Sequence, residues 1–221
     1  MHKFKGAIFD LDGVLVDTEN LNCQAWIEVS KSYGFSFSKK DFAKYAGKQG
    51  KFMDKDLIEK FHLRIKKGVL YEEKRKISTK LLREKEIKIM PCVRTTLRFL
   101  KKKGLKIAVA TGSPKNETLL KLKKTKLFHY FSAIVSGLEV KRGKPYPDSY
   151  LLATKKLGFS PKECFAIEDS QAGLESAKSA GLICFVVPSD FSKNQDFSKA
   201  DKVFPSLKNL VEFLKTEGIN Q

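Results

Sequence analysis

The chain has 221 residues and a formal net charge of +18, because 43 lysines and arginines outnumber 25 aspartates and glutamates. With 42% hydrophobic residues it is long enough to fold throughout around a substantial core, as one large domain or as a domain with an insertion. No apolar run approaches the roughly 20 residues of a membrane span. The first residues, MHKFKG, lack the pattern of a signal peptide, so we expect a cytoplasmic protein with no membrane partner.

The large positive charge raises the question of nucleic-acid binding. However, the lysines within residues 101–103 and 121–126 alternate with leucines, as on the solvated face of amphipathic helices. No zinc-finger, RNP-type or helix-turn-helix motif accompanies them. We therefore expect no specific nucleic-acid partner and favour small anionic substrates.

The four cysteines are far apart in the sequence and form no CxxC pair. They are Cys23, Cys92, Cys164 and Cys184. Most of them have apolar neighbours, which favours buried free thiols over disulfides or a zinc site.

The stretch FKGAIFDLDGVLVDTE near the amino terminus carries the first functional signal. Its apolar residues 7–9 end in Asp10 and Asp12, which is typical of a buried parallel strand with carboxylates at its carboxyl end. Alternation along the strand directs both carboxylates to the same side. They would repel each other by roughly 4 kcal/mol at ~4 Å and an effective dielectric near 20, so they need a cation or a shared proton. An oxygen-liganded divalent metal meets this need, and an Asp-rich turn without function is the alternative.

The pattern changes to helical spacing after this stretch. Apolar residues recur at intervals of four before a glycine stop: Leu21, Ala25, Val29, Tyr33 and Gly34. Further helices are expected around residues 40–45, 53–61 and 69–82. No convincing strand occurs between residues 17 and 88, so the segment is predicted to be an all-helical insertion.

From Pro91 onward, helices alternate with apolar strands, which predicts an α/β fold with a Rossmann-like parallel sheet and helices on both of its faces. The expected strands are residues 105–112, 133–137, 164–170 and 182–187, with an edge strand at 202–204. The expected helices are residues 94–103, 147–157 and 171–180, and a last one with Ser206 as its cap. Ser113 and Pro114 are predicted to open another helix, as its N-cap and first-turn proline.

Polar side chains follow four of these strands. They are Asp10 and Asp12, Thr111 and Ser113, Lys144, and Glu168 and Asp169. Each alone has an ordinary explanation, such as a local hydrogen bond, a surface lysine or a helix cap. Since parallel strands end at one edge of a sheet, we expect the seven to converge there.

The four stretches DLDGVLVDTE, VATGS, GKPYPD and IEDSQAG resemble the four motifs of the haloacid dehalogenase-like superfamily of phosphohydrolases, in the subgroup with a helical cap. The match covers essentially the whole chain, with motifs and cap in the family's order. The resemblance implies a core domain of residues 1–16 and 88–221 and a cap domain of residues 17–87. It also implies a phosphatase that hydrolyses small phosphorylated metabolites, such as sugar phosphates, through an aspartyl phosphate. We expect it to be a monomer.

The resemblance assigns catalytic roles. Asp10 would be the nucleophile that attacks phosphorus, and Asp12 would protonate the leaving alcohol and then deprotonate water. Lys144 would neutralise Asp10 and the transferred group. The implied phosphate-binding residues are Leu11, Thr111, Gly112, Ser113 and Lys144. The presence of Asp12 argues against a dehalogenase, since a halide leaves without an acid.

The resemblance also implies a magnesium ion. Its ligands would be the Asp10 carboxylate, the Asp12 backbone carbonyl and Asp169, with Glu168 binding directly or through water.

Substrate choice is expected to depend on the insertion. In the stretch YAGKQGKFMD, Lys48 or Lys51 could hold a second negative group of the substrate, and the alternative is that both are solvent-exposed. A β-phosphoglucomutase-like mutase is the competing enzyme. Where such mutases carry a histidine and an arginine, simple spacing places Asn22 and Gly50, which favours the phosphatase. A non-catalytic or nucleic-acid-binding protein on the same fold is the remaining alternative.

Overall fold

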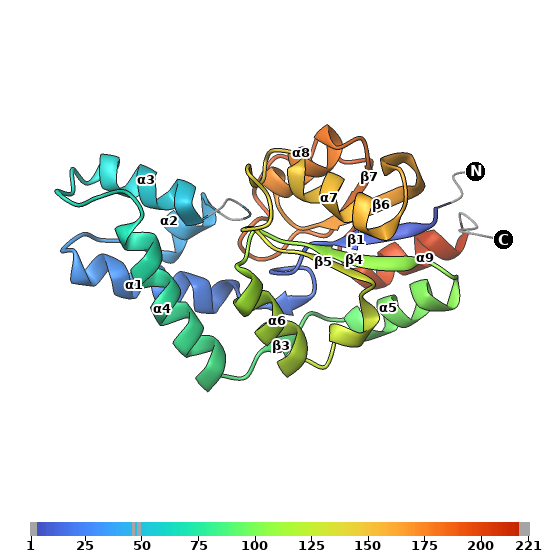
Figure 1. The fold of residues 1–221 in the computed structure, drawn as a ribbon, viewed down its shortest axis with the longest axis horizontal. Helices are drawn as coiled ribbons and strands as arrows, with labels where there is room; N and C mark the ends of the chain where they lie inside the picture. The colour runs from blue at the N-terminus through green and yellow to red at the C-terminus, as the bar shows by residue number, and fades with distance from the viewer. Residues whose placement is uncertain (1–3, 46, 48–49, 217–221) are drawn as a thin grey trace.

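A six-stranded parallel sheet forms the centre of the larger of two lobes in the computed structural model, which describes residues 4–45, 47 and 50–216 (Figure 1). The strand order is β5 (Ala133–Val135), β4 (Lys106–Ala110), β1 (Gly6–Phe9), β6 (Cys164–Glu168), β7 (Ile183–Val186) and β8 (Lys202–Val203). Every adjacent pair is parallel. The carboxyl ends of the central strands therefore lie at one edge, as predicted.

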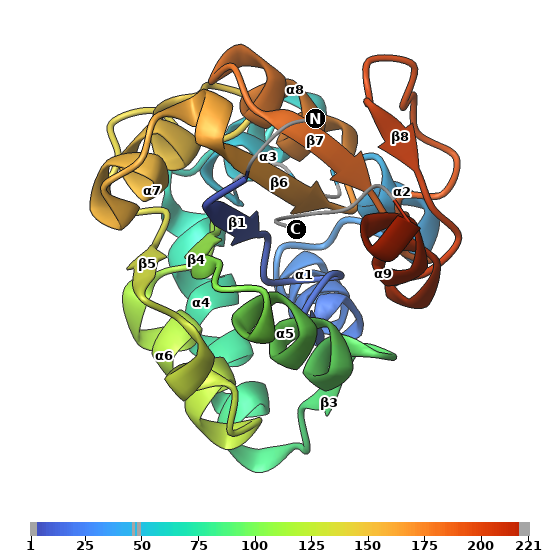
Figure 2. The same ribbon diagram turned by 90° about the vertical axis from the view of Figure 1, so that its right-hand side faces the viewer.

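Helices cover both faces of the sheet (Figure 2). One face carries α5 (Val93–Lys102), α6 (Lys115–Lys124) and α9 (Leu207–Thr216), and the other carries α7 (Asp148–Leu157) and α8 (Gln171–Ser179). In β1 the period of two places Phe9 in the first apolar layer and Ile8 in the second, both fully buried. The predicted α/β fold is confirmed.

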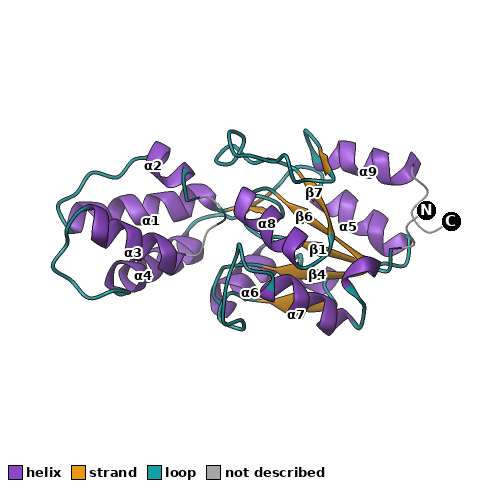
Figure 3. Cartoon of the chain, turned by 90° about the horizontal axis from the view of Figure 1, so that it is seen from above, coloured by secondary structure: helices purple, strands orange, loops and turns teal. Residues whose placement is uncertain are grey.

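The smaller lobe consists of α1 (Glu19–Ser32), α2 (Lys39–Ala43), α3 (Gly50–Lys60) and α4 (Val69–Glu84). These helices lie together at one end of the molecule (Figure 3). They share an apolar cluster of their own, which includes Trp26, Leu57 and Leu70. The chain enters and leaves the lobe through an antiparallel ribbon of β2 (Val16–Asp17) and β3 (Lys88–Ile89). The described residues between these two strands contain no strand, so the predicted helical insertion is present.

Three local predictions concern helix caps and cysteines. Pro114, not Ser113, is the N-cap of α6, because the Ser113 hydroxyl is instead bonded to Asp12. Ser206 acts as expected, since its hydroxyl accepts from Asn209 N–H at 3.3 Å. All four cysteines are free, but the prediction that they are buried is wrong for Cys92, which is exposed at the N-cap of α5.

Among the described helices, none combines the length and apolarity needed to cross a bilayer.

Candidate active site

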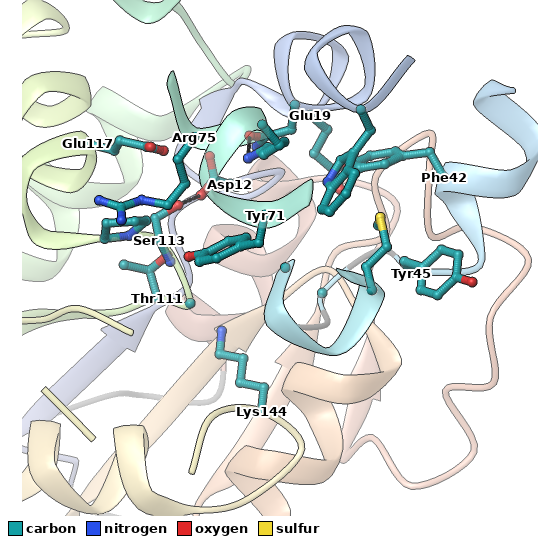
Figure 4. A pocket seen from close by; sticks show the side chains of 18 of the residues that line it. Asp12, Glu19, Phe42, Tyr45, Tyr71, Arg75, Thr111, Ser113, Glu117 and Lys144 are labelled. Atoms are coloured by element: carbon teal, nitrogen blue, oxygen red, sulfur yellow. Dashed lines mark hydrogen bonds between the residues drawn. The ribbon is translucent and has the colours of Figure 1, made fainter. Parts of the chain in front are cut away.

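Residues from three of the four predicted motifs, including Asp12, Thr111 and Lys144, line one pocket together with residues of the smaller lobe (Figure 4). The fourth motif reaches the same place through Glu168, which pairs with Lys144. Asp10 and Thr111 follow the neighbouring strands β1 and β4, and Lys144 lies in the loop after β5. With residues of the smaller lobe they line a cavity of about 110 Å³. Asp12, Gly112 and Ser113 also line it, whereas the Leu11 side chain is fully buried in the core, so only its backbone is available to a ligand.

Lys144 is held between two carboxylates. Its Nζ lies 2.5 Å from Asp10 Oδ1 and 2.5 Å from Glu168 Oε1. The buried Tyr150 hydroxyl donates to the same Glu168 oxygen at 2.7 Å. Burial alone would lower the pKa of Lys144, but attraction to Asp10 and Glu168 outweighs it and raises that pKa. Lys144 therefore carries a positive charge beside Asp10 throughout the physiological pH range.

The carboxylates at this edge form a cluster that fits a divalent cation. Asp10, Glu168 and Asp169 each place an oxygen within 4.8 Å of the others. Burial raises the pKa of Asp10 to about 7, against the opposing effect of Lys144, and raises that of Asp169 well above its usual range. A cation would relieve this cost of ionisation, because it supplies the charge that water cannot.

Asp169 offers the clearest ligand atom in the cluster. Its Oδ2 is buried and has no hydrogen-bond partner among the described residues. The turn at Gly13, with φ of 87°, brings the backbone so close that a Cβ there would collide with this oxygen. Glu168 differs, since Lys144 and Tyr150 occupy its Oε1 and the Asp169 N–H donates to its Oε2 at 3.1 Å. Asp10 and Asp169 are therefore better placed than Glu168 to offer an oxygen to a cation.

Asp12 points toward α6. Lys121 Nζ lies 2.6 Å from Asp12 Oδ1, the Ser113 hydroxyl donates to Oδ2 at 2.8 Å, and the Thr18 hydroxyl also donates to Oδ1. Burial would raise the pKa of Asp12, but Lys121 outweighs it and the pKa is lowered. Asp12 is thereby held in its ionised form.

The position of Lys121 corrects the sequence interpretation, which placed it on a solvated helix face. Its side chain is fully buried. It lies one turn after Glu117, which is also buried and lines the cavity, so the two share the face of α6 that turns toward the site. Because an i, i+4 pair of opposite charges is common on exposed helix faces, the sequence carried no signal that separates Lys121 from the surrounding lysines.

Replacing Lys121 with methionine is expected to reduce the free energy of unfolding by about 3 kcal/mol at neutral pH, because Asp12 would keep its charge without its cation. Urea denaturation measures this change. Lys123→Met on the exposed side of α6 is the matched control and should alter stability by less than about 0.5 kcal/mol. Adding Asp12→Asn to Lys121→Met should recover part of the loss. Equal stability of the two single methionine variants would contradict the role of this ion pair.

The smaller lobe contributes an aromatic wall and two cations to the cavity. The apolar part consists of Trp26, Phe42, Tyr45, Met53 and Tyr71. The cations are Lys74 and Arg75 of α4, which the sequence interpretation missed. The sequence feature that could have indicated Lys74 and Arg75 is a series of polar residues at helical spacing on one face of α4, from Tyr71 through Lys74 to Ser78.

The predicted residues of the smaller lobe behave differently from one another. Asn22 lines the cavity, and its Oδ1 accepts from Lys74 Nζ at 2.7 Å. Lys51 is exposed and does not line the cavity, so the structure does not support it as a substrate contact. Lys48 lies outside the described residues.

Glu19 is a further buried carboxylate that the sequence interpretation did not single out. It lines the cavity, and its Oε2 accepts from the Ser189 hydroxyl at 2.8 Å. Burial raises its pKa to about 8, and the charges of Asp12 and Asp10 act in the same direction. The sequence feature that could have indicated Glu19 as a site residue is its position directly after Thr18, where the insertion begins.

This fold and site define a hydrolase with a buried carboxylate and lysine centre under a helical cap. The family model of the haloacid dehalogenase-like hydrolases matches residues 7–187. The chain is 38% identical over 187 residues to a phosphorylated carbohydrates phosphatase of Thermotoga maritima, covering 80% of this chain and 82% of the relative. It is 29% identical over 180 residues to a fructose-1-phosphate phosphatase of Escherichia coli, covering 81% and 94%.

A solved structure of similar fold supports the same family. A β-phosphoglucomutase of Clostridium difficile superposes with a TM-score of 0.86 at 25% identity, covering 97% of this chain and 96% of the other. The chain belongs to the haloacid dehalogenase-like hydrolase family, and it is a phosphomonoester hydrolase of that family.

Proposed function

We propose that this enzyme hydrolyses small phosphorylated metabolites, in particular sugar phosphates, with Mg²⁺ and through an aspartyl phosphate on Asp10. The observation that carries the proposal is the buried Lys144 ammonium, 2.5 Å from Asp10 at the floor of a small cavity. An ionised carboxylate held beside a fixed cation is suited to attack a phosphoryl group whose negative charge the same cation offsets. The relatives named for phosphorylated carbohydrates and fructose 1-phosphate support the substrate class.

The two lobes divide the work in this proposal. Residues 1–16 and 88–221 form the catalytic core, and residues 17–87 form the cap, with the boundaries at the β2–β3 ribbon. The core supplies the groups that act on phosphorus, and the cap supplies the wall that the leaving group contacts. A cavity of this size between core and cap favours small esters over bulky ones, and closure of the cap over a bound substrate would keep bulk water away from the reaction.

The residues of the chain account for both chemical steps. An Asp10 oxygen forms a bond to phosphorus as the bond to the leaving oxygen breaks. Asp12, which Lys121 keeps ionised in the free enzyme, must first take up a proton from solvent, and it then delivers that proton to the leaving oxygen. In the second step the ionised Asp12 takes a proton from water, which attacks the phosphoryl group and releases Asp10. Thr111 and the backbone of Gly112 face the phosphoryl oxygens. A Mg²⁺ held by Asp10, Asp169 and the Asp12 carbonyl would neutralise charge on those oxygens.

The mutase alternative has a specific observation in its favour, which is the likeness to a β-phosphoglucomutase. Against it stands the environment of Gly50, the position where the sequence comparison with mutases places an arginine. A Cβ on Gly50 would lie 2.5 Å from Tyr71 Cε2. The cap thus has no room for that side chain, which supports net hydrolysis.

The test is a screen of phosphorylated metabolites for release of inorganic phosphate. We expect Mg²⁺-dependent release from hexose monophosphates that stops on chelation, and a lower melting temperature without the metal because the ionised carboxylates then repel. Conversion of glucose 1-phosphate to glucose 6-phosphate without phosphate release, followed by NMR, would instead identify a mutase. No turnover of any phosphomonoester would refute the proposal.

A further inference from the structure

A segment of the larger lobe extends onto the smaller one. Residues 188–196, which we call the clasp, follow β7, and Phe191 within them is only 7% exposed. Among the described members of the buried apolar cluster of the smaller lobe, Phe191 is the only one that belongs to the larger lobe. Its ring is withdrawn from water only while the two lobes are together, so this contact favours the arrangement in which they meet.

The clasp contacts α2 along the length of this short helix. Lys39 Nζ, at its start, lies 4.8 Å from the centre of the Phe191 ring. The Phe42 ring meets the Phe191 ring edge to face, at 87° and with the ring centres 5.2 Å apart. Gln195 Nε2 donates to the carbonyl oxygen of Ala43, the last residue of α2, at 3.5 Å. The clasp therefore contacts both ends and the middle of α2.

The clasp itself is fixed to the larger lobe. Ser189 N–H donates to the Ser192 hydroxyl at 2.9 Å, and Ser192 N–H donates to the Ser189 carbonyl at 3.1 Å, which closes a turn around Phe191. Gln195 Oε1 accepts from Gln171 N–H, at the start of α8, at 2.7 Å. Because the turn is closed and anchored, the Phe191 ring has a defined position from which it can determine where α2 lies.

The position of α2 affects the wall of the cavity. Phe42 of α2 lines the cavity, and so does Tyr45, which follows this helix. Figure 4 shows both rings on the side of the pocket opposite to Thr111 and Ser113. Phe191 does not itself line the cavity, so any effect on a substrate passes through Phe42. Displacement of α2 would widen the cavity on the side that faces the leaving group.

We propose that Phe191 is a positioning residue that holds α2 and the Phe42 wall against the core, and that it thereby restricts the enzyme to small leaving groups. This inference rests on the proposed phosphatase activity. The clasp must release α2 whenever the cap opens for substrate or product. Since only the closed arrangement has the narrow wall, weakening the clasp reduces the population that discriminates by size.

The experiment compares Phe191→Ala with the unaltered enzyme on fructose 1-phosphate and on 2-naphthyl phosphate, whose leaving group is bulky. The ratio of kcat/KM for the small ester to that for the bulky ester should fall about tenfold in the variant, as for the loss of an aromatic contact. For fructose 1-phosphate, KM should rise while kcat changes by less than about twofold, because the groups that act on phosphorus are unaltered.

Phe197→Ala is the matched control for this comparison. Phe197 lies in the same connection between β7 and β8, but it packs against the apolar layer of the larger lobe. The ratio of the two kcat/KM values should therefore stay at that of the unaltered enzyme. Phe191→Leu keeps an apolar side chain without the ring, so its ratio should lie between those of Phe191→Ala and the unaltered enzyme. It also replaces the alanine variant if that variant does not fold.

Hydrogen exchange tests the clasp without a substrate. Peptides covering residues 38–45, which include α2, should exchange about tenfold faster in Phe191→Ala than in the unaltered protein, whereas β1 and β4 should keep their protection. Unchanged exchange at residues 38–45, or an unchanged ratio of the two kcat/KM values, would overturn the inference and leave the phosphatase proposal intact. The same change in Phe197→Ala as in Phe191→Ala would also overturn it, because it would indicate a general loosening.

The unaltered enzyme separates the failure of this inference from that of the proposed function. If it released phosphate from neither ester, the phosphatase proposal would fail, and the size selection assigned to Phe191 with it.

Discussion

Replacement of Asp10 by asparagine is expected to reduce phosphate release by about 10⁴-fold or more, because an amide cannot take the place of the attacking carboxylate. The side chains have nearly the same shape, so the cavity remains. Steady-state phosphate release measures the loss. Asp17→Asn is the matched control, since Asp17 is an exposed carboxylate in β2 that does not line the cavity, and its activity should be unchanged.

The Asp12→Asn variant distinguishes the catalytic role of Asp12 from that of Asp10. Phenyl phosphate has a good leaving group, so this variant should still phosphorylate Asp10 while the second step is slow for lack of a base. Acid quenching followed by mass spectrometry should therefore detect a phosphorylated Asp12→Asn protein and no phosphorylated Asp10→Asn protein. Equal and mild losses in the two variants would contradict the assigned roles.

Replacement of Lys144 by alanine is expected to lower kcat/KM by about 10² or more, because the ammonium that offsets the charge of Asp10 and the phosphoryl group is lost. Lys141→Ala, an exposed lysine in the same loop, is the control and should retain full activity. Residual activity above a tenth in Lys144→Ala would argue that the cation has only a structural role.

The pH dependence of kcat/KM provides a second test of the role of Lys144. Lys144 holds down the pKa of Asp10, which burial has raised to about 7. Removing Lys144 therefore raises that pKa further, and a larger share of Asp10 is protonated and inactive at neutral pH. We expect the acid limb of the pH profile of kcat/KM to move to higher pH in Lys144→Ala. A shift to lower pH would contradict the contact between Lys144 and Asp10.

The polar side chains at the carboxyl ends of the parallel strands could be predicted from the sequence. Each of them follows a strand that a local run of apolar residues identifies. Apolar residues 7–9 and 106–110 form β1 and β4, and topology rules place the ends of such strands together. The helical insertion was predictable for the same reason, since periodicity and glycine stops are local. The prediction of helix ends was less accurate. Ser113 does not cap α6, because Asp12 from a distant part of the sequence binds its hydroxyl.

The sequence by itself determined the order of strands and helices, the four clusters of reactive side chains and their meeting at one sheet edge, since these depend on local periodicity and on general rules of parallel sheets. Only the tertiary structure decided which of the 43 lysines and arginines are buried and what they contact. Lys121 resembles its exposed neighbours in sequence, and Asp12 lies 109 residues away from it. The contact of Tyr71 with Gly50 likewise depends on how α3 packs against α4. Such contacts arise from the global packing of long side chains, which no local pattern encodes.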